Sequence, residues 1–162
     1  MESKTSLILR LIPSLFFFVK LKTLLDKDPL IKRLAPHETE IFHFKPANPT
    51  RPQYIGSDLH FSCGFEVQSF EWGSSFINIS LKNEYEKSGS IFLFIPETDG
   101  NRNALDSIDA TVNGEAIGVE VVARPIINDG KTKNSRAGRV IKVRVNIAGL
   151  KEQSDGKIEI SW

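Results

Sequence analysis

The feature that most constrains this fold is a two-residue alternation of apolar and polar side chains from residue 59 onward. Successive residues of a β-strand lie on opposite faces of a sheet, so each alternating run predicts a half-buried strand. Such runs are found at 59–67, 77–81, 108–112, 117–121, 141–147 and 158–162. Residues 90–95, SIFLFI, are apolar at every position after the initial serine, which predicts a strand covered on both faces. Asn113-Gly114 is a strong hairpin signal, and Ser-Gly or Asp-Gly pairs separate other runs.

About seven strands with short turns, and no helical pattern after residue 36, predict a mainly β fold. The expected architecture is an antiparallel β-sandwich of immunoglobulin-like type. Its likeness to immunoglobulin domains is architectural only, because one cysteine cannot supply their Cys…Trp…Cys pattern. A chain of 162 residues can bury one core without disulfides. A membrane barrel fits less well, since its strands need about nine to eleven residues and most runs are shorter.

The N-terminal segment is apolar but short. Residues 7–19, LILRLIPSLFFFV, would reach roughly 20 Å as a helix, less than a hydrocarbon core, and Arg10 interrupts them. No small-residue cleavage site follows, as a signal peptide would require. Helical spacing from Pro13 instead predicts an amphipathic helix, and Asp28-Pro29 a second short helix over 29–34. The residues expected to contact a membrane or a partner are Leu15, Phe17, Phe18, Leu21, Leu24 and Leu25.

The predicted organisation has three parts. Residues 1–36 form the hydrophobic and amphipathic helical segment, 37–52 a proline-rich linker, and 53–162 the sandwich domain. The string PANPTRP at 46–52 favours extended polyproline II geometry and opposes strand pairing. Its Pro46, Pro49 and Arg51 also have the spacing that SH3-type grooves accept, although a plain linker explains them as well.

Charge indicates local rather than global anion binding, because the net charge is only +1. A cationic stretch contains Lys131, Lys133 and Arg136 in an expected loop. Arg139, Lys142 and Arg144 are expected on the solvent side of the next strand. We predict a weak anion site at Lys131, Lys133 and Arg136, for anionic lipid or acidic protein, with ordinary solvated surface as the alternative. Nucleic acid is not expected, because this region has no aromatic side chains for stacking.

The sequence offers little for catalysis or cofactors. There is no nucleophile elbow, phosphate loop or metalloprotease helix, so we expect no enzyme activity and no cofactor. His60 and Cys63 are three apart in an expected strand and would point to opposite faces, which argues against a metal site. A weak calcium candidate remains in one loop, without the glycine and glutamate of an EF-hand. Its members are Asp99, Asn101, Asn103 and Asp106.

Two functions remain after these exclusions. The first is a non-catalytic binding or accessory β-sandwich module, held at a membrane surface by its N-terminal helix. The alternative is a soluble interaction subunit whose N-terminal helix docks into a larger protein complex. Membrane association is the favoured location, since an apolar helix face flanked by lysines is typical of a membrane interface.

Overall fold

The computed structural model describes residues 5–12, 18–25, 31, 33, 35–37, 41–59, 64–82, 88–98, 100–128, 135–146 and 156–162. Within these residues the chain forms thirteen strands and one 3-10 turn, η1 (Ala104–Asp106). All strand pairs are antiparallel. The prediction of a mainly β, antiparallel fold is therefore confirmed.

Two five-stranded sheets form the sandwich. The strands of sheet I follow the order β10-β12-β7-β4, with β11 pairing β12. They are β4 (Gln53–Ser57), β7 (Ser88–Pro96), β10 (Val119–Ala123), β11 (Ile126–Asn128) and β12 (Ser135–Asn146). The strands of sheet II follow the order β5-β6-β13-β8-β9. They are β5 (Val67–Trp72), β6 (Phe76–Leu81), β8 (Asp109–Val112), β9 (Glu115–Ile117) and β13 (Gly156–Ser161).

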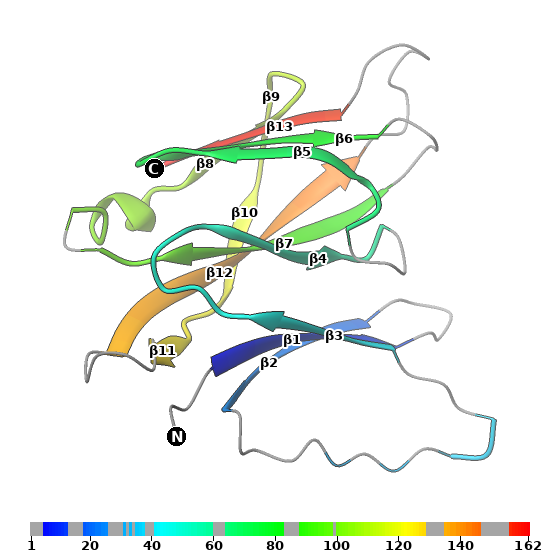
Figure 1. Cartoon of the computed structure of the whole chain (residues 1–162). Coiled ribbons are helices and arrows are strands. Elements are labelled where there is room, and N and C mark those ends of the chain that lie inside the picture. The colour runs from blue at the N-terminus through cyan, green and yellow to red at the C-terminus, as the bar shows by residue number, and fades with distance from the viewer. Residues whose placement is uncertain are drawn as a thin grey trace.

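A third sheet, the N-terminal sheet, comes from the first 46 residues. Its order is β2-β1-β3, with β1 (Thr5–Ile12), β2 (Phe18–Leu25) and β3 (Ile41–Pro46). Figure 1 shows three layers, with sheet II uppermost, sheet I in the middle and the N-terminal sheet below it. Sheet I thus has a neighbouring layer on each of its faces.

The inner core lies between sheets I and II and is aliphatic. From β7 it takes Ile91, Leu93 and Ile95, which are fully buried, and it includes residues of β6, β8, β12 and β13. The alternate β7 residues Phe92 and Phe94 belong to a second, outer core on the opposite face of sheet I. The two cores explain why residues 91–95 are apolar at every position, and they confirm that this strand is covered on both sides.

The predicted N-terminal helix is wrong. Of its expected contact residues, Phe18, Leu21, Leu24 and Leu25 lie in strand β2, and Leu15 and Phe17 lie outside the described residues. The sequence of β2, FVKLKTLL, alternates in part with period two, and β1 supplies a partner over its full length. Pairing to a neighbouring strand satisfies the backbone of both segments, and this tertiary interaction overrides the helical spacing. Within the expected second helix, the described Ile31 and Arg33 are exposed and in no regular element.

Two further segments differ from expectation. Strand β3 occupies residues 41–46, inside the expected linker, and pairs with β1. The predicted strand at 59–67 is wrong at Leu59 and Gly64–Glu66, which form bends and turns between β4 and β5, and only Val67 of its described residues lies in a strand. Glu66, in this segment, is buried and accepts a hydrogen bond from the Tyr54 hydroxyl. The domain boundaries themselves remain a prediction.

Candidate binding surfaces

The strand register defines the two faces of the N-terminal sheet. Arg10 lies directly opposite Lys20 of β2 and Phe42 of β3, and Ile8 lies opposite Lys22 and Phe44. Since alternate residues share a face, one face of this sheet collects a defined set of positions. That set, called here the cationic face, is Ser6, Ile8, Arg10, Ile12, Phe18, Lys20, Lys22, Leu24, Phe42, Phe44 and Pro46.

Phe42 and Phe44 are positions of the cationic face whose side chains the structure describes, and Phe44 is exposed. Its side chain is 54% exposed, and its ring lies 6.5 Å from the ring of Phe42. The register places Leu7, Leu9 and Leu11 of β1 on the opposite face. Figure 1 shows the N-terminal sheet as one of the two outer layers.

The charge of this sheet has one sign. Its three strands contain Arg10, Lys20, Lys22 and Lys45 and no carboxylate. Like charges directly opposite each other on a sheet are destabilising, and the register puts Arg10 and Lys20 in that relation. An anion bound at this face would offset the repulsion.

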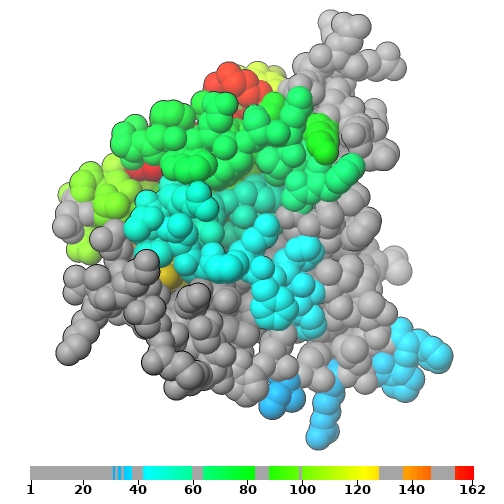
Figure 2. Space-filling model, in the orientation of Figure 1, coloured from blue at the N-terminus to red at the C-terminus, as the bar shows by residue number. Residues whose placement is uncertain are grey.

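A second surface is the groove between β4 and β5, called here the Arg51–Trp72 groove. One lobe, of about 240 Å³, is lined by Lys45, Arg51, Pro52, Gln53, Tyr54, Phe70 and Trp72. The adjoining lobe, of about 310 Å³, shares Pro52 and Trp72 and is lined by uncharged residues, with Trp162 among them. Figure 2 shows this side of the molecule, where the segment containing β3 and β4 lies beneath β5 and β6.

The wall of this groove is held by a closed loop. The Asn48 side-chain oxygen accepts hydrogen bonds from the Thr50 amide at 2.9 Å and hydroxyl at 2.7 Å. The Asn48 amide donates to Gln53 Oε1 at 2.6 Å, and Gln53 Nε2 donates to the Pro46 carbonyl at 2.9 Å. The proline-containing segment at 46–52 is therefore a hydrogen-bonded turn that presents Arg51 to the groove.

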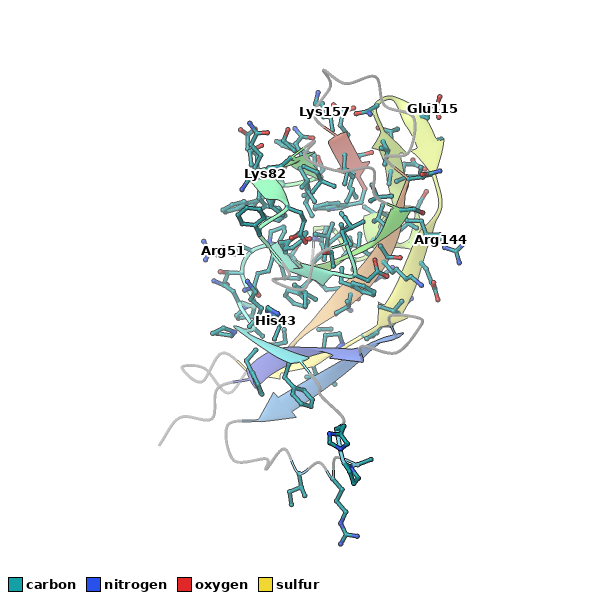
Figure 3. The ribbon with its side chains drawn as sticks, turned by 90° about the vertical axis from the view of Figure 1, so that its right-hand side faces the viewer. His43, Arg51, Lys82, Glu115, Arg144 and Lys157 are labelled. Carbon is teal, nitrogen blue, oxygen red and sulfur yellow. The ribbon has the colours of Figure 1, made fainter. Side chains whose placement is uncertain are left out.

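A third surface lies on the opposite edge of the molecule. Figure 3 places His43, Arg51 and Lys82 along one edge and Glu115 and Arg144 along the other. There, a polar groove of about 930 Å³ opens between the β8–β9 hairpin and the end of β12, where Lys142, Arg144 and Glu115 contribute charge. Lys142 Nζ lies 3.8 Å from Glu120 Oε2, so charges of both signs meet here.

The predicted anion site is placed only in part. Lys131 and Lys133 lie outside the described residues, and Arg136 lies in β12, opposite Ile127 of β11. Arg139 was expected at the surface, and that expectation is wrong, because its side chain is 3% exposed. It donates from Nε to Glu97 at 3.1 Å and from Nη2 to Asp106 at 2.8 Å, and Nη1 donates to the Leu105 carbonyl.

The loop proposed for calcium is organised by this arginine. Asp106 pairs with Arg139, and Asn101 accepts from the Thr98 amide at 2.7 Å and donates to the Pro96 carbonyl at 3.1 Å. Asn103 precedes η1 without a side-chain capping bond, and Asp99 lies outside the described residues. Within the described part of the chain, no three His, Cys, Asp or Glu residues gather as a metal site would need.

Two carboxylates are sequestered where β4 ends. Glu66 is 2% exposed, and it accepts from the Tyr54 hydroxyl at 2.5 Å, the Ser57 hydroxyl and the Gly64 amide at 2.8 Å. Asp58 accepts a hydrogen bond from the Ser90 amide. Burial raises the pKa of Asp58 above its usual value, while the Ser90 amide and Lys142 act in the opposite direction. Both carboxylates fasten the β4–β5 connection to the sandwich.

Comparison with known proteins adds no relative: no family model, no curated protein and no solved structure matches this chain. Among the described residues, none belongs to a helix with the length and apolar character needed to cross a membrane.

Proposed function

We propose that this protein is a non-catalytic binding module that associates with anionic membrane surfaces through its cationic face. The module is a sandwich of immunoglobulin-like architecture in the sense of two facing antiparallel sheets. Its strand order differs from that of immunoglobulin domains, so the likeness does not extend to connectivity.

The observation that carries the proposal is the direct cross-strand pairing of Arg10 with Lys20, beside Lys22 and the exposed Phe44. Lipid phosphates offer the anions that this arrangement lacks. Cations interleaved with apolar side chains are typical of elements that lie in a membrane interface. A sheet can present this combination as well as a helix, because the register gathers alternate residues on one face.

The N-terminal leucines are separated from the cations by the strand register. Leu7, Leu9 and Leu11 alternate with Ile8 and Arg10 along β1, so they occupy the other face of the sheet. The face that we assign to lipid is the mixed cationic and aromatic one. This composition supports reversible, salt-sensitive association and not a deep anchor.

Binding of the full chain to vesicles tests the proposal. Vesicles of phosphatidylcholine containing phosphatidylserine should bind the protein, and vesicles of phosphatidylcholine alone should bind it far less. Each cation near an anionic surface contributes about 1 kcal/mol, so replacing Arg10, Lys20 and Lys22 together with glutamine should weaken binding roughly a hundredfold.

A matched variant separates this site from net charge. Replacing the exposed Arg124, Arg144 and Lys157 with glutamine removes the same three charges from other elements and should leave vesicle binding nearly unchanged. Equal losses in the two variants would show that the cationic face is not special. If the protein binds neither kind of vesicle but binds a protein partner through Arg10, Lys20 and Lys22, the result would favour an interaction subunit.

A further inference from the structure

The Arg51–Trp72 groove lies between two free sheet edges. This position suits a second kind of binding, separate from the proposed membrane function. β4 is the terminal strand of sheet I and β5 is the terminal strand of sheet II. The groove is lined by Gln53 and Tyr54 from β4 and by Phe70 and Trp72 from β5. Among the described strands, neither β4 nor β5 has a partner on its outer side. A free edge offers backbone donors and acceptors to an extended peptide.

The charge of the groove is positive. Lys45 and Arg51 line the lobe beside β4, and neither lobe has a carboxylate among its lining residues. Glu71 of β5 pairs in register with Asn78 and lies on the opposite face from Phe70 and Trp72. The groove therefore complements an acidic group at one end and uncharged groups at the other.

The geometry of Trp72 favours a carboxylate over a stacked ring. Its side chain is 43% exposed, but the Arg51 guanidinium lies 5.7 Å from its centroid and the Phe70 ring lies 5.8 Å away, tilted by 38°. Arg51 and Phe70 already lie against this ring, so a stacked sugar or base would have to displace one of them. A guanidinium that lies over an aromatic ring still presents its N–H groups to a carboxylate.

The groove is also preorganised. The loop that carries Arg51 is closed by the hydrogen bonds of Asn48 and Gln53, and Pro52 is buried beside it. On the other side, Gly73 donates to the Phe76 carbonyl at 3.0 Å, and a side chain at Gly73 would overlap the Phe76 ring. Walls fixed before binding reduce the entropy that a ligand must overcome.

We propose that the Arg51–Trp72 groove binds an extended acidic peptide segment of a partner protein. The segment pairs with the free edge of β5 and places a carboxylate between Arg51 and Lys45. Its uncharged residues continue into the lobe lined by Thr50, Ser74 and Thr98.

Selection from a displayed library of random nonapeptides on the full-length protein tests this inference. Peptides that carry Asp or Glu, with apolar residues at alternate positions, should be enriched. Binding of the corresponding synthetic peptide can be followed by intrinsic fluorescence, because both tryptophans of the chain, Trp72 and Trp162, line the groove. Failure to enrich acidic peptides would overturn the proposal.

Two protein variants and one modified peptide make the result specific. Arg51→Gln, at an exposed side chain, should weaken the selected peptide roughly tenfold to a hundredfold, and the exposed control Arg124→Gln should not. Unchanged binding by Arg51→Gln would overturn the site. N-methylation of alternate peptide amides should abolish binding, and retained affinity would contradict edge pairing.

The same peptide separates this inference from the membrane proposal. The variant without Arg10, Lys20 and Lys22 should bind the peptide normally while losing vesicles. The Arg51→Gln variant should keep vesicle binding. If the peptide is lost with the N-terminal cations instead, the groove is not its site.

Discussion

The two faces of sheet I are both apolar, and each is covered by a different layer of the protein. The inner face packs on sheet II through aliphatic residues, and the outer face carries Phe92 and Phe94 beside the N-terminal sheet. The stretch that resembles a membrane anchor supplies strands of the layer next to this outer face. It forms strands because β1 is paired along its length with both β2 and β3.

Two adjacent residues of β12 show the difference most sharply. Arg139 lies opposite Ile95 and belongs to the inner side of the strand, where its guanidinium ties the 97–106 loop over the end of the core. Gly138 lies opposite Pro96 and leaves room for the Phe94 ring. On the inner face, the buried Arg139 guanidinium holds a loop over the core. On the outer face, Gly138 has no side chain, and the Phe94 ring occupies that space.

The largest effect is expected from Arg139→Met. The change leaves Glu97, whose side chain is only 11% exposed, without its buried partner, and it frees the Leu105 carbonyl. Breaking a buried ion pair on one side costs about 3–5 kcal/mol of unfolding free energy. Urea denaturation measures it. Arg102→Met is the matched control, because that side chain is 68% exposed and should cost less than about 1 kcal/mol. Equal losses would mean that Arg139 is an ordinary surface cation.

A smaller effect is expected from Gly138→Ala. The added methyl group would overlap the Phe94 ring and lie 3.1 Å from the Ile95 carbonyl oxygen. Overpacking of this kind costs about 1–3 kcal/mol. The penalty should shrink when Phe94 is replaced with Leu, which a double-mutant cycle detects. If the two changes are additive, the outer core does not depend on that contact.

The smallest effect on the unfolding free energy is expected at Asp58, which follows β4 and accepts a hydrogen bond from β7, and this effect depends on pH. Because burial raises the pKa of Asp58, the folded protein holds that proton more tightly than the unfolded chain does. The resulting stability is present below the unfolded pKa of about 3.9 and is lost as pH rises through the folded pKa. Asp58→Asn should therefore raise the unfolding free energy more at pH 7 than at pH 3, in urea titrations at both values. Asp109→Asn, at an exposed side chain, should show no such trend.

Much of the sandwich could be predicted from alternation. The strands at 77–81, 90–95, 108–112 and 158–162 are formed, and the Asn113-Gly114 turn has positive φ at both residues, as its hairpin type requires. The N-terminal strands could not be predicted in this way. Eight-residue runs such as FVKLKTLL fit a helix and a strand alike, and only the partner strand decides between them.

The candidate sites were harder to predict for a related reason. Arg51 and Trp72 are 21 residues apart, and nothing local joins a loop cation to the end of a distant strand. Arg139 alternates with the inward-facing Ile141 and Val143, so the two-residue period places it on the inner face. Grouping it with the cations Lys142 and Arg144 overlooked that it lies three residues before the first of them. The signal that existed was the paired acids Glu97 and Asp106 in a loop otherwise assigned to calcium.

The double burial of β7 has a consequence for synthesis of the chain. Phe92 and Phe94 leave the ribosome well before Val140, their companion in the outer core. At about 5–20 residues per second, the 46 positions from Phe94 to Val140 take roughly 2–9 s to translate. During that interval the nascent strand is apolar on both faces, and at least one face lacks its partner strands. We therefore expect a chaperone to bind this stretch.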